Sequence, residues 1–188
     1  FESWRRSSLR TGRRSGNTVR VTDPNLAIIV LAAGQGTRMK SATPKLLHDL
    51  AGAPVVAHVL ATAEALQPAV VIGVVRHERD QVADAITARL PEAIIVDQDE
   101  VPGTGRAVEL AVQALPPDFT GEVLVLNGDV PLLDADTLAE LVARHRADGA
   151  AATILSSVVP EPAGYGRIVR AMDGSLSRIV EHKDATAE

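Results

Sequence analysis

The sequence LAIIVLAAGQGTRM, residues 26–39, joins an apolar run to a glycine-rich loop. The run LAIIVLAA (26–33) is continuous, which is typical of a β-strand buried on both faces of a parallel sheet. Gly34 and Gly36 follow the run at once, and Arg38 stands two positions further on. Glycines at a strand end let backbone N–H groups approach an anionic ligand, and arginine adds charge for phosphates. These residues therefore suggest a phosphate-binding loop at the end of a buried strand.

Two well-known phosphate-binding patterns do not match this loop. The dinucleotide-binding fingerprint requires a third glycine three residues after the second, and Met39 stands there, which disfavours an NAD-dependent oxidoreductase. A Walker loop requires Gly-Lys-Ser/Thr, whereas this loop continues as Gly-Thr-Arg. On the two glycines alone, a tight strand-to-helix turn with surface cations is the simpler interpretation.

Strand-like and helix-like segments alternate along the rest of the chain. Helices are predicted over residues 54–66, 78–90, 104–115 and 134–149, and strands over residues 69–75, 93–96, 122–127 and 152–159. A turn at Asp173-Gly174 predicts a C-terminal β-hairpin. This alternation indicates an α/β fold with a Rossmann-like, mainly parallel sheet and helices on both faces. Ligands of such sheets bind beyond the carboxyl ends of the strands, here after residues 33, 97, 127 and 159.

Composition and charge exclude several classes of protein. The chain has no cysteine, so a disulfide framework and a thiolate metal site are excluded, and no apolar run reaches the roughly 20 residues of a membrane helix. The net charge is −5 although six arginines lie among the first 20 residues, so the remaining chain is acidic and unsuited to nucleic acid. We expect a disordered basic leader over 1–22, a folded domain over 23–188, and a cytoplasmic protein with neither nucleic-acid nor membrane partners.

Four longer stretches resemble one enzyme family of the nucleotidyltransferase superfamily. They are LAAGQGTRMKSATPKLL (31–47), PGTGRAVELA (102–111), VLVLNGDVPLLDADTL (123–138) and GYGRIVR with RIVEHKDAT (164–186). Together they are similar to the bacterial bifunctional N-acetylglucosamine-1-phosphate uridylyltransferase / glucosamine-1-phosphate N-acetyltransferases. The resemblance implies UTP and N-acetylglucosamine 1-phosphate as substrates, UDP-N-acetylglucosamine and pyrophosphate as products, and Mg²⁺ as the cofactor.

The resemblance also implies parts that this chain lacks. The family's uridylyltransferase domain continues beyond the position of residue 188, with a sugar-binding asparagine and a second metal ligand there. A β-helix that performs acetyl transfer and forms a homotrimer follows it. No hexapeptide repeat of that kind occurs in these 188 residues. We therefore expect a C-terminally truncated domain that is inactive alone, and we assign acetylation and the trimer to its full-length parent.

The resemblance assigns roles to individual residues. The reaction is an in-line attack on the α-phosphorus, so its catalysts are expected to position groups and neutralise charge. Arg38 is expected to hold the departing phosphates, Lys45 to offset charge on the α-phosphate, and Asp129 to bind Mg²⁺. The expected nucleotide contacts are Leu31, Ala32, Ala33, Gly34, Gln98, Gly103, Thr104, Asn127 and Gly128. The expected sugar contacts are Gly166 and Glu181.

Several alternatives stay open at this point. Lys45 can be a solvated cation, Gln98 an ordinary loop residue, Asp129 a turn residue and Glu181 a surface charge. The histidines are interpreted as structural or solvent-facing: His48, His58, His77, His145 and His182. Arg106 stands where the family usually has histidine, which leaves the fine contacts of the base pocket open. The rival functions are a sugar-phosphate nucleotidyltransferase that uses dTTP, CTP or GTP, and a non-catalytic nucleotide-sugar-binding module.

Overall fold

The structure is a computed structural model that describes residues 22–36, 39, 41 and 43–186. Most of the expected leader, residues 1–21, and the expected phosphate-binding Arg38 lie outside the described residues. The chain divides into two compact units, Phe1–Leu138 and Ala139–Glu188. Each unit is therefore described by itself.

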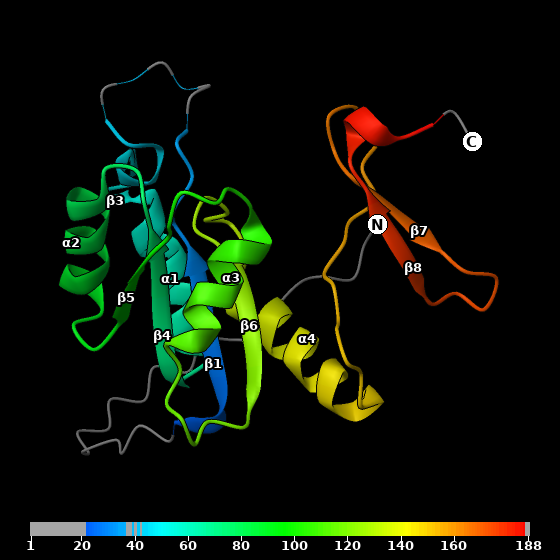
Figure 1. Cartoon of the computed structure of the whole chain (residues 1–188), viewed down its shortest axis with the longest axis horizontal. Coiled ribbons are helices and arrows are strands. Elements are labelled where there is room, and N and C mark those ends of the chain that lie inside the picture. Colours follow the sequence, from blue (N-terminus) through cyan, green and yellow to red (C-terminus); the bar gives the residue numbers. More distant parts are fainter. Residues whose placement is uncertain (1–21, 37–38, 40, 42, 187–188) are drawn as a thin grey trace, which may run out of the picture. The chain divides into compact units, whose positions relative to one another are not determined.

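The first unit is built on a four-stranded sheet in the order β5-β4-β1-β6, with every neighbouring pair parallel (Figure 1). Its strands are β1 (Asp23–Leu31), β4 (Pro68–Val75), β5 (Ile94–Asp97) and β6 (Glu122–Asn127). In the register of the sheet, Ile29 of β1 lies opposite Ile72 of β4 and Val125 of β6. The mainly parallel α/β sheet predicted from the sequence is confirmed.

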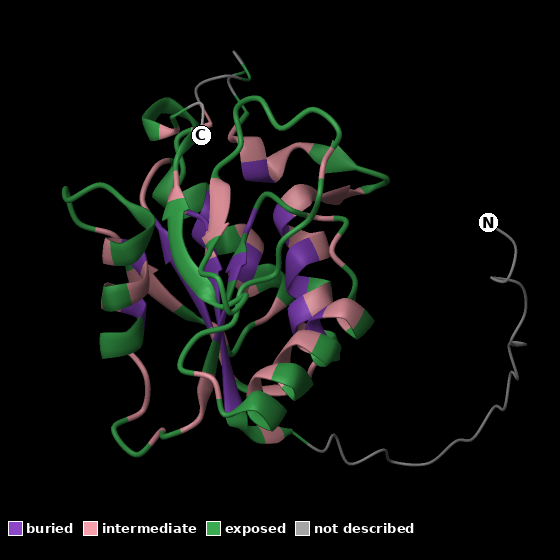
Figure 2. Ribbon diagram, turned by 90° about the vertical axis from the view of Figure 1, so that its right-hand side faces the viewer, coloured by how far each residue is buried: buried purple, intermediate pink, exposed green. Residues whose placement is uncertain are grey.

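Helices cover both faces of this sheet. They are α1 (Val55–Ala65), α2 (Arg79–Arg89) and α3 (Thr104–Gln113). On one face, the two central strands and α3 share a buried cluster of Ile29, Ile72, Val74, Ala107 and Ala111. Gly73 points to the opposite face, where a Cβ would stand 2.8 Å from Ile86 of α2. Buried residues accordingly concentrate in the strands and in the helix surfaces that meet them (Figure 2).

The other elements of the first unit are short, apart from a helix that crosses the boundary between the units. That helix is α4 (Ala135–Asp148). A single 3₁₀ turn, η2 (Lys45–Leu47), precedes a small antiparallel pair, β2 (Asp49–Leu50) and β3 (Ala53–Pro54). The sequence patterns did not predict the turn or the small pair, because elements of two or three residues are too short to display a hydrophobic period.

The prediction of a strand over residues 152–159 is wrong. Residues 152–159 form no regular secondary structure, and the side chains from residue 152 to residue 158 are exposed. A strand is stable only when its backbone N–H and C=O groups pair with a neighbour. Residues 152–159 pair with no strand of the described residues, so their apolar side chains have strand composition without a strand partner.

The second unit contains the predicted β-hairpin. Its strands are β7 (Arg167–Arg170) and β8 (Leu176–Val180), which pair antiparallel, and the 3₁₀ turn η3 (His182–Asp184) follows. The carboxylate of Asp173 accepts hydrogen bonds from the Ser175 N–H at 2.9 Å and the Ser175 hydroxyl at 2.6 Å. Gly174 adopts a φ of +84°, which favours glycine at this turn position.

In the part of the chain that the structure describes, no helix has both the length and the apolar content that a membrane crossing requires.

Candidate active site

A pocket of about 480 Å³ opens at the carboxyl ends of the parallel strands. Its wall includes Leu31 at the end of β1, Arg76 after β4, Gln98 after β5 and Asn127 at the end of β6. Parallel α/β sheets bind their ligands at this edge, and the volume lies in the range of small-molecule sites. The pocket is therefore the candidate site for an anionic ligand.

The glycine loop after β1 forms one wall of the pocket and packs tightly against Lys45. Gly36 has a φ of +61°, and a Cβ on Gly36 would stand 2.8 Å from the Cβ of Lys45. Only glycine fits this position without strain, because the backbone is left-handed and the neighbouring chain is close. Gly34 differs, since no atom lies within 4 Å of the place that its Cβ would occupy. The first position of the pair thus leaves room for a ligand, and the second brings Lys45 close to the loop.

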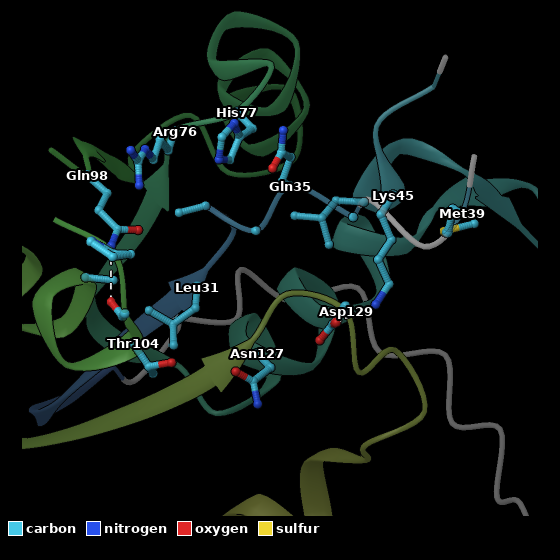
Figure 3. Close-up of a pocket in the computed structure, with 17 residues that line it drawn as sticks. Leu31, Gln35, Met39, Lys45, Arg76, His77, Gln98, Thr104, Asn127 and Asp129 are labelled. Atoms are coloured by element: carbon cyan, nitrogen blue, oxygen red, sulfur yellow. Dashed lines mark hydrogen bonds and ion pairs between the residues drawn. The ribbon is translucent and has the colours of Figure 1, made fainter. Parts of the chain in front are cut away.

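Lys45 and Asp129 form the charged end of the pocket (Figure 3). The ammonium of Lys45, the first residue of η2, donates to the Asp129 carboxylate at an Nζ–Oδ2 distance of 2.6 Å. The two side chains are 38% and 40% exposed, so a ligand can reach both of them. The buried side chain of Leu46 anchors η2, which fixes the position of the lysine backbone. Residues 84 positions apart in the chain are therefore joined at the mouth of the pocket.

Gln98 and the loop after it form the opposite end. The Gln98 side-chain amide donates from Nε2 to the carbonyl oxygens of Val101 and Gly103, both at 3.1 Å. These two acceptors identify the NH₂ group, and among the described residues Oε1 has no hydrogen-bond donor facing it. Gln98 therefore presents an acceptor to the pocket. Thr104, the first residue of α3, lines the same end (Figure 3).

Arg106 holds this loop from outside the pocket. Its guanidinium donates from Nε to Asp99 at 2.9 Å and from Nη1 to Glu109 at 2.8 Å. The hydrogen bond from Arg106 holds the pKa of the Asp99 carboxyl below its usual value, and the same two carboxylates raise the pKa of Arg106. Arg106 is absent from the residues that line the pocket, so any effect of Arg106 on the pocket passes through the Asp99 loop.

The structure brings most of the expected nucleotide and phosphate residues around one pocket. The pocket is lined by Leu31, Ala33, Gly34, Lys45, Gln98, Gly103, Thr104, Asn127 and Asp129. Ala32 and Gly128 are buried beside it, with the Gly128 N–H donating to the Leu31 carbonyl at 2.9 Å. Gly166 and Glu181 lie in the second unit, where the hairpin brings them near each other, with Glu181 Oε2 4.0 Å from the Cβ position of Gly166. The roles of these residues stay predictions.

Seven further residues line the pocket that the sequence patterns did not single out as site residues. They are Gln35, Met39, Leu46, Arg76, His77, Pro102 and Ala107. Two of them follow β4, and the loop after residue 75 was not among the loops expected to bind ligand. The rule that ligands bind beyond parallel strands applies to that loop as well and was the available signal. His77, interpreted from the sequence as structural or solvent-facing, is placed in the pocket wall.

The donor set at the charged end fits a divalent cation that arrives with a phosphate ligand. Asp129 supplies one carboxylate, and no group of three or more histidine, cysteine or acidic side chains able to hold a metal occurs among the described residues. Mg²⁺ commonly takes one or two protein carboxylates and completes its octahedron with phosphate oxygens and water. A cation held permanently by protein side chains alone would need more ligands than the described residues of this pocket offer.

The chain belongs to the family of MobA-like NTP transferase domains, whose model matches residues 28–185. It is 73% identical over 166 residues to the Bifunctional protein GlmU of Leifsonia xyli subsp. xyli (strain CTCB07), covering 88% of this chain and 34% of that protein. It is 58% identical over 165 residues to the protein of the same name from Clavibacter sepedonicus, with the same two coverages. The chain thus spans about a third of the length of the curated relatives that it matches. The family resemblance expected from the sequence is confirmed.

A solved structure shows the same fold. The UDP-glucose pyrophosphorylase from Acinetobacter baumanii matches with a TM-score of 0.65 at 21% identity, covering 83% of this chain and 67% of that one.

Proposed function

We propose that this domain transfers a uridylyl group from UTP to N-acetylglucosamine 1-phosphate. The observation that carries the proposal is one pocket with the Lys45–Asp129 pair at one end and the acceptor of Gln98 at the other. A nucleoside triphosphate has the matching polarity, with a base at one end and phosphates at the other. The identity of 73% to a Bifunctional protein GlmU supports the choice of substrates.

The charged end suits the displacement at the α-phosphorus. An oxygen of the sugar phosphate forms a bond to that phosphorus, the bond to the β-phosphate breaks, and pyrophosphate leaves. A phosphate monoester has a second pKa of about 6, so the attacking oxygen is already largely ionised at neutral pH and no general base is needed. Lys45 offsets charge on the phosphate oxygens, and Mg²⁺, held by Asp129, supplies further charge neutralisation when bound. Arg38, at the end of the glycine loop, is proposed to hold the leaving phosphates.

The other end suits uracil. Uracil carries a hydrogen on N3, which the Oε1 atom of Gln98 can accept, whereas cytosine has an unprotonated N3 that would face the same oxygen. Leu31 and Ala33 offer a small apolar surface for the ring and the sugar. A base pocket that accepts from N3 therefore favours UTP and dTTP over CTP, and the proposal takes UTP.

Gly166 and Glu181 in the second unit are proposed to contact the sugar of the acceptor. Acetylation of glucosamine 1-phosphate with acetyl-CoA, and assembly into a homotrimer, are proposed only for a longer protein of the kind that the curated relatives represent.

The test is a chimera in which residue 188 is joined to the part of the Leifsonia xyli relative that follows the matched region. Pyrophosphate release is measured with N-acetylglucosamine 1-phosphate, Mg²⁺ and each of UTP, CTP, dTTP and GTP in turn. We expect release with UTP to exceed release with the other three. A preference for another triphosphate would reassign the substrate, and binding of UTP without pyrophosphate release would favour a non-catalytic binding module.

A further inference from the structure

Arg76 lies beside Gln98 at the end of the pocket farthest from Lys45 (Figure 3). The parallel register pairs Val74 with Val96 and Val75 with Asp97, and the Gln98 N–H donates to the Val75 carbonyl at 2.8 Å. The pairing therefore continues past the strands, with Arg76 next to Gln98. Side chains alternate along a strand, so Arg76 shares the face of Val74, which α3 covers and on which the pocket opens.

Most N–H donors of the Arg76 guanidinium have no acceptor among the described residues. Its one described hydrogen bond runs from Nη2 to the Glu100 carbonyl at 3.4 Å, a long contact. No carboxylate of the described residues forms an ion pair with Arg76, in contrast to Arg79 and Arg106. An arginine carries five N–H donors, so most of those of Arg76 remain for a ligand.

We infer that Arg76 is a specificity-determining residue for the base, because its guanidinium can donate to the O4 carbonyl oxygen of uracil while Gln98 accepts from N3–H. The inference rests on the proposed function. Uracil has a carbonyl on each side of N3–H, so a donor and an acceptor that lie side by side match two adjacent positions of its edge. Cytosine has an amino group in place of O4 and an unprotonated N3, so the same placement would set the Arg76 donor against another donor and leave the Gln98 oxygen unpaired, which disfavours CTP.

Two other roles for Arg76 must be separated from this one. Through Glu100 the arginine also touches the loop at residues 98–103, so a purely structural role is the first alternative. Arg106 provides the matched control, because it holds the same loop through Asp99 but lies outside the pocket wall. Contact with phosphates is the second alternative, and inorganic triphosphate, which has no base, tests for it.

The experiment is calorimetric titration of the 188-residue chain with UTP, CTP and inorganic triphosphate in the presence of Mg²⁺. We expect Arg76→Ala to weaken UTP binding about tenfold, which is the size of a lost charge-assisted hydrogen bond, and to change the Kd of CTP and of inorganic triphosphate by less than about twofold. Arg106→Ala should leave the ratio of UTP to CTP affinity unchanged. Lys45→Ala should differ from Arg76→Ala, because it should weaken the binding of inorganic triphosphate, UTP and CTP to a similar extent.

Equal losses for UTP and CTP in Arg76→Ala would overturn the inference, as would a comparable loss for inorganic triphosphate. Thermal unfolding of each variant verifies that it is folded, and Arg76→Met, which keeps the length of the side chain, replaces the alanine variant if that one does not fold. If the unaltered chain binds inorganic triphosphate but shows no preference for UTP over CTP, the inference fails while phosphate binding stands. If it binds no triphosphate at all, the proposed function fails, and the inference fails with it.

Discussion

In the proposed metal site, a bound metal ion and Lys45 would share one carboxylate, that of Asp129. The side chains of Lys45 and Asp129 are each about 40% exposed. An ion pair between such exposed side chains stabilises the protein by about 0.2–1 kcal/mol, so removing it would change the affinity of a competing ligand roughly one- to fivefold. We predict that, without nucleotide, the weak Mn²⁺ binding that the Asp129 carboxylate alone supports is up to about fivefold tighter in Lys45→Met than in the unaltered chain, and that Asp129→Asn abolishes it. Water-proton relaxation in a Mn²⁺ titration measures both effects.

The matched control for this prediction is Arg79→Met. Arg79 pairs with Asp97 at 2.8 Å, is similarly exposed and lies outside the pocket wall, so its removal changes the net charge equally without freeing Asp129. Equal tightening in Arg79→Met and Lys45→Met would mean that overall charge, and not the Lys45–Asp129 contact, sets the affinity for the metal.

Replacing each of the two loop glycines by alanine is predicted to affect stability and UTP binding differently. Gly36→Ala places a residue with a side chain at a φ of +61° and 2.8 Å from the Cβ of Lys45, so it should destabilise the fold by about 1–3 kcal/mol and also weaken UTP binding. Gly34→Ala meets no atom within 4 Å, so it should keep the melting temperature and weaken UTP binding, because the methyl group enters the pocket. Thermal unfolding and UTP titration of both variants separate the two effects. A drop in melting temperature for Gly34→Ala comparable to that for Gly36→Ala would contradict this account.

At the scale of the elements, the sequence predicted what local patterns can encode. The strand at 26–33 was predictable because Leu26–Val30 are all buried, and a strand covered on both faces needs apolar residues at every position. The strand at 152–159 was predicted wrongly because pairing with a distant neighbour, which no local pattern records, decides whether an apolar run becomes a strand. Arg76 escaped prediction for a related reason, since its place beside Gln98 follows from the register of two strands rather than from its own surroundings in the chain.

The start of α4 gives a prediction on pH dependence. Asp134 precedes the helix, and its carboxylate accepts the Thr137 N–H at 2.8 Å and the Thr137 hydroxyl at 3.0 Å. These hydrogen bonds, that of the backbone first, lower the pKa of Asp134 below its ordinary value of 3.8. A carboxyl whose pKa is lower in the folded state stabilises that state above the ordinary value and loses this contribution as the pH falls through the lowered one.

We therefore expect Asp134→Ala to lower the melting temperature at neutral pH by about 2–4 °C, the usual effect of a lost helix cap in a domain of this size. The difference from the unaltered chain should shrink as the pH falls below 3.8. Asp134→Asn should keep most of the stability at neutral pH, because an amide oxygen can also cap the helix. Its stabilising contribution should not decline at acidic pH, because the amide does not titrate. Circular dichroism melts across pH measure the differences between variants. A constant difference between Asp134→Ala and the unaltered chain down to strongly acidic pH would show that the carboxylate is not the cap.

On the scale of the whole molecule, the residues proposed for the nucleotide and those proposed for the sugar belong to different units. Every described residue that lines the pocket lies between Leu31 and Asp129, in the first unit, whereas the proposed sugar contacts Gly166 and Glu181 belong to the second. The described part of the pocket offers one carboxylate for the metal. The groups proposed to bind nucleotide are therefore gathered in one place, whereas the proposed catalysis would require positioning that these groups alone provide only in part.

We predict that the 188-residue chain binds UTP but releases pyrophosphate at least ~10²-fold more slowly than its chimera with the following part of the Leifsonia xyli relative, since misplacement of a reacting group by about 1 Å costs a factor of that order. UTP should raise the melting temperature of both proteins, because a ligand that binds only the folded state stabilises it. The measurement is a continuous assay of pyrophosphate with saturating UTP, N-acetylglucosamine 1-phosphate and Mg²⁺, with Asp129→Asn of each protein as the blank. Equal rates from the chain and the chimera would mean that the catalytic site is complete within residues 1–188. A chain that gains no stability from UTP would mean that the pocket between Leu31 and Asp129 does not bind nucleotide by itself.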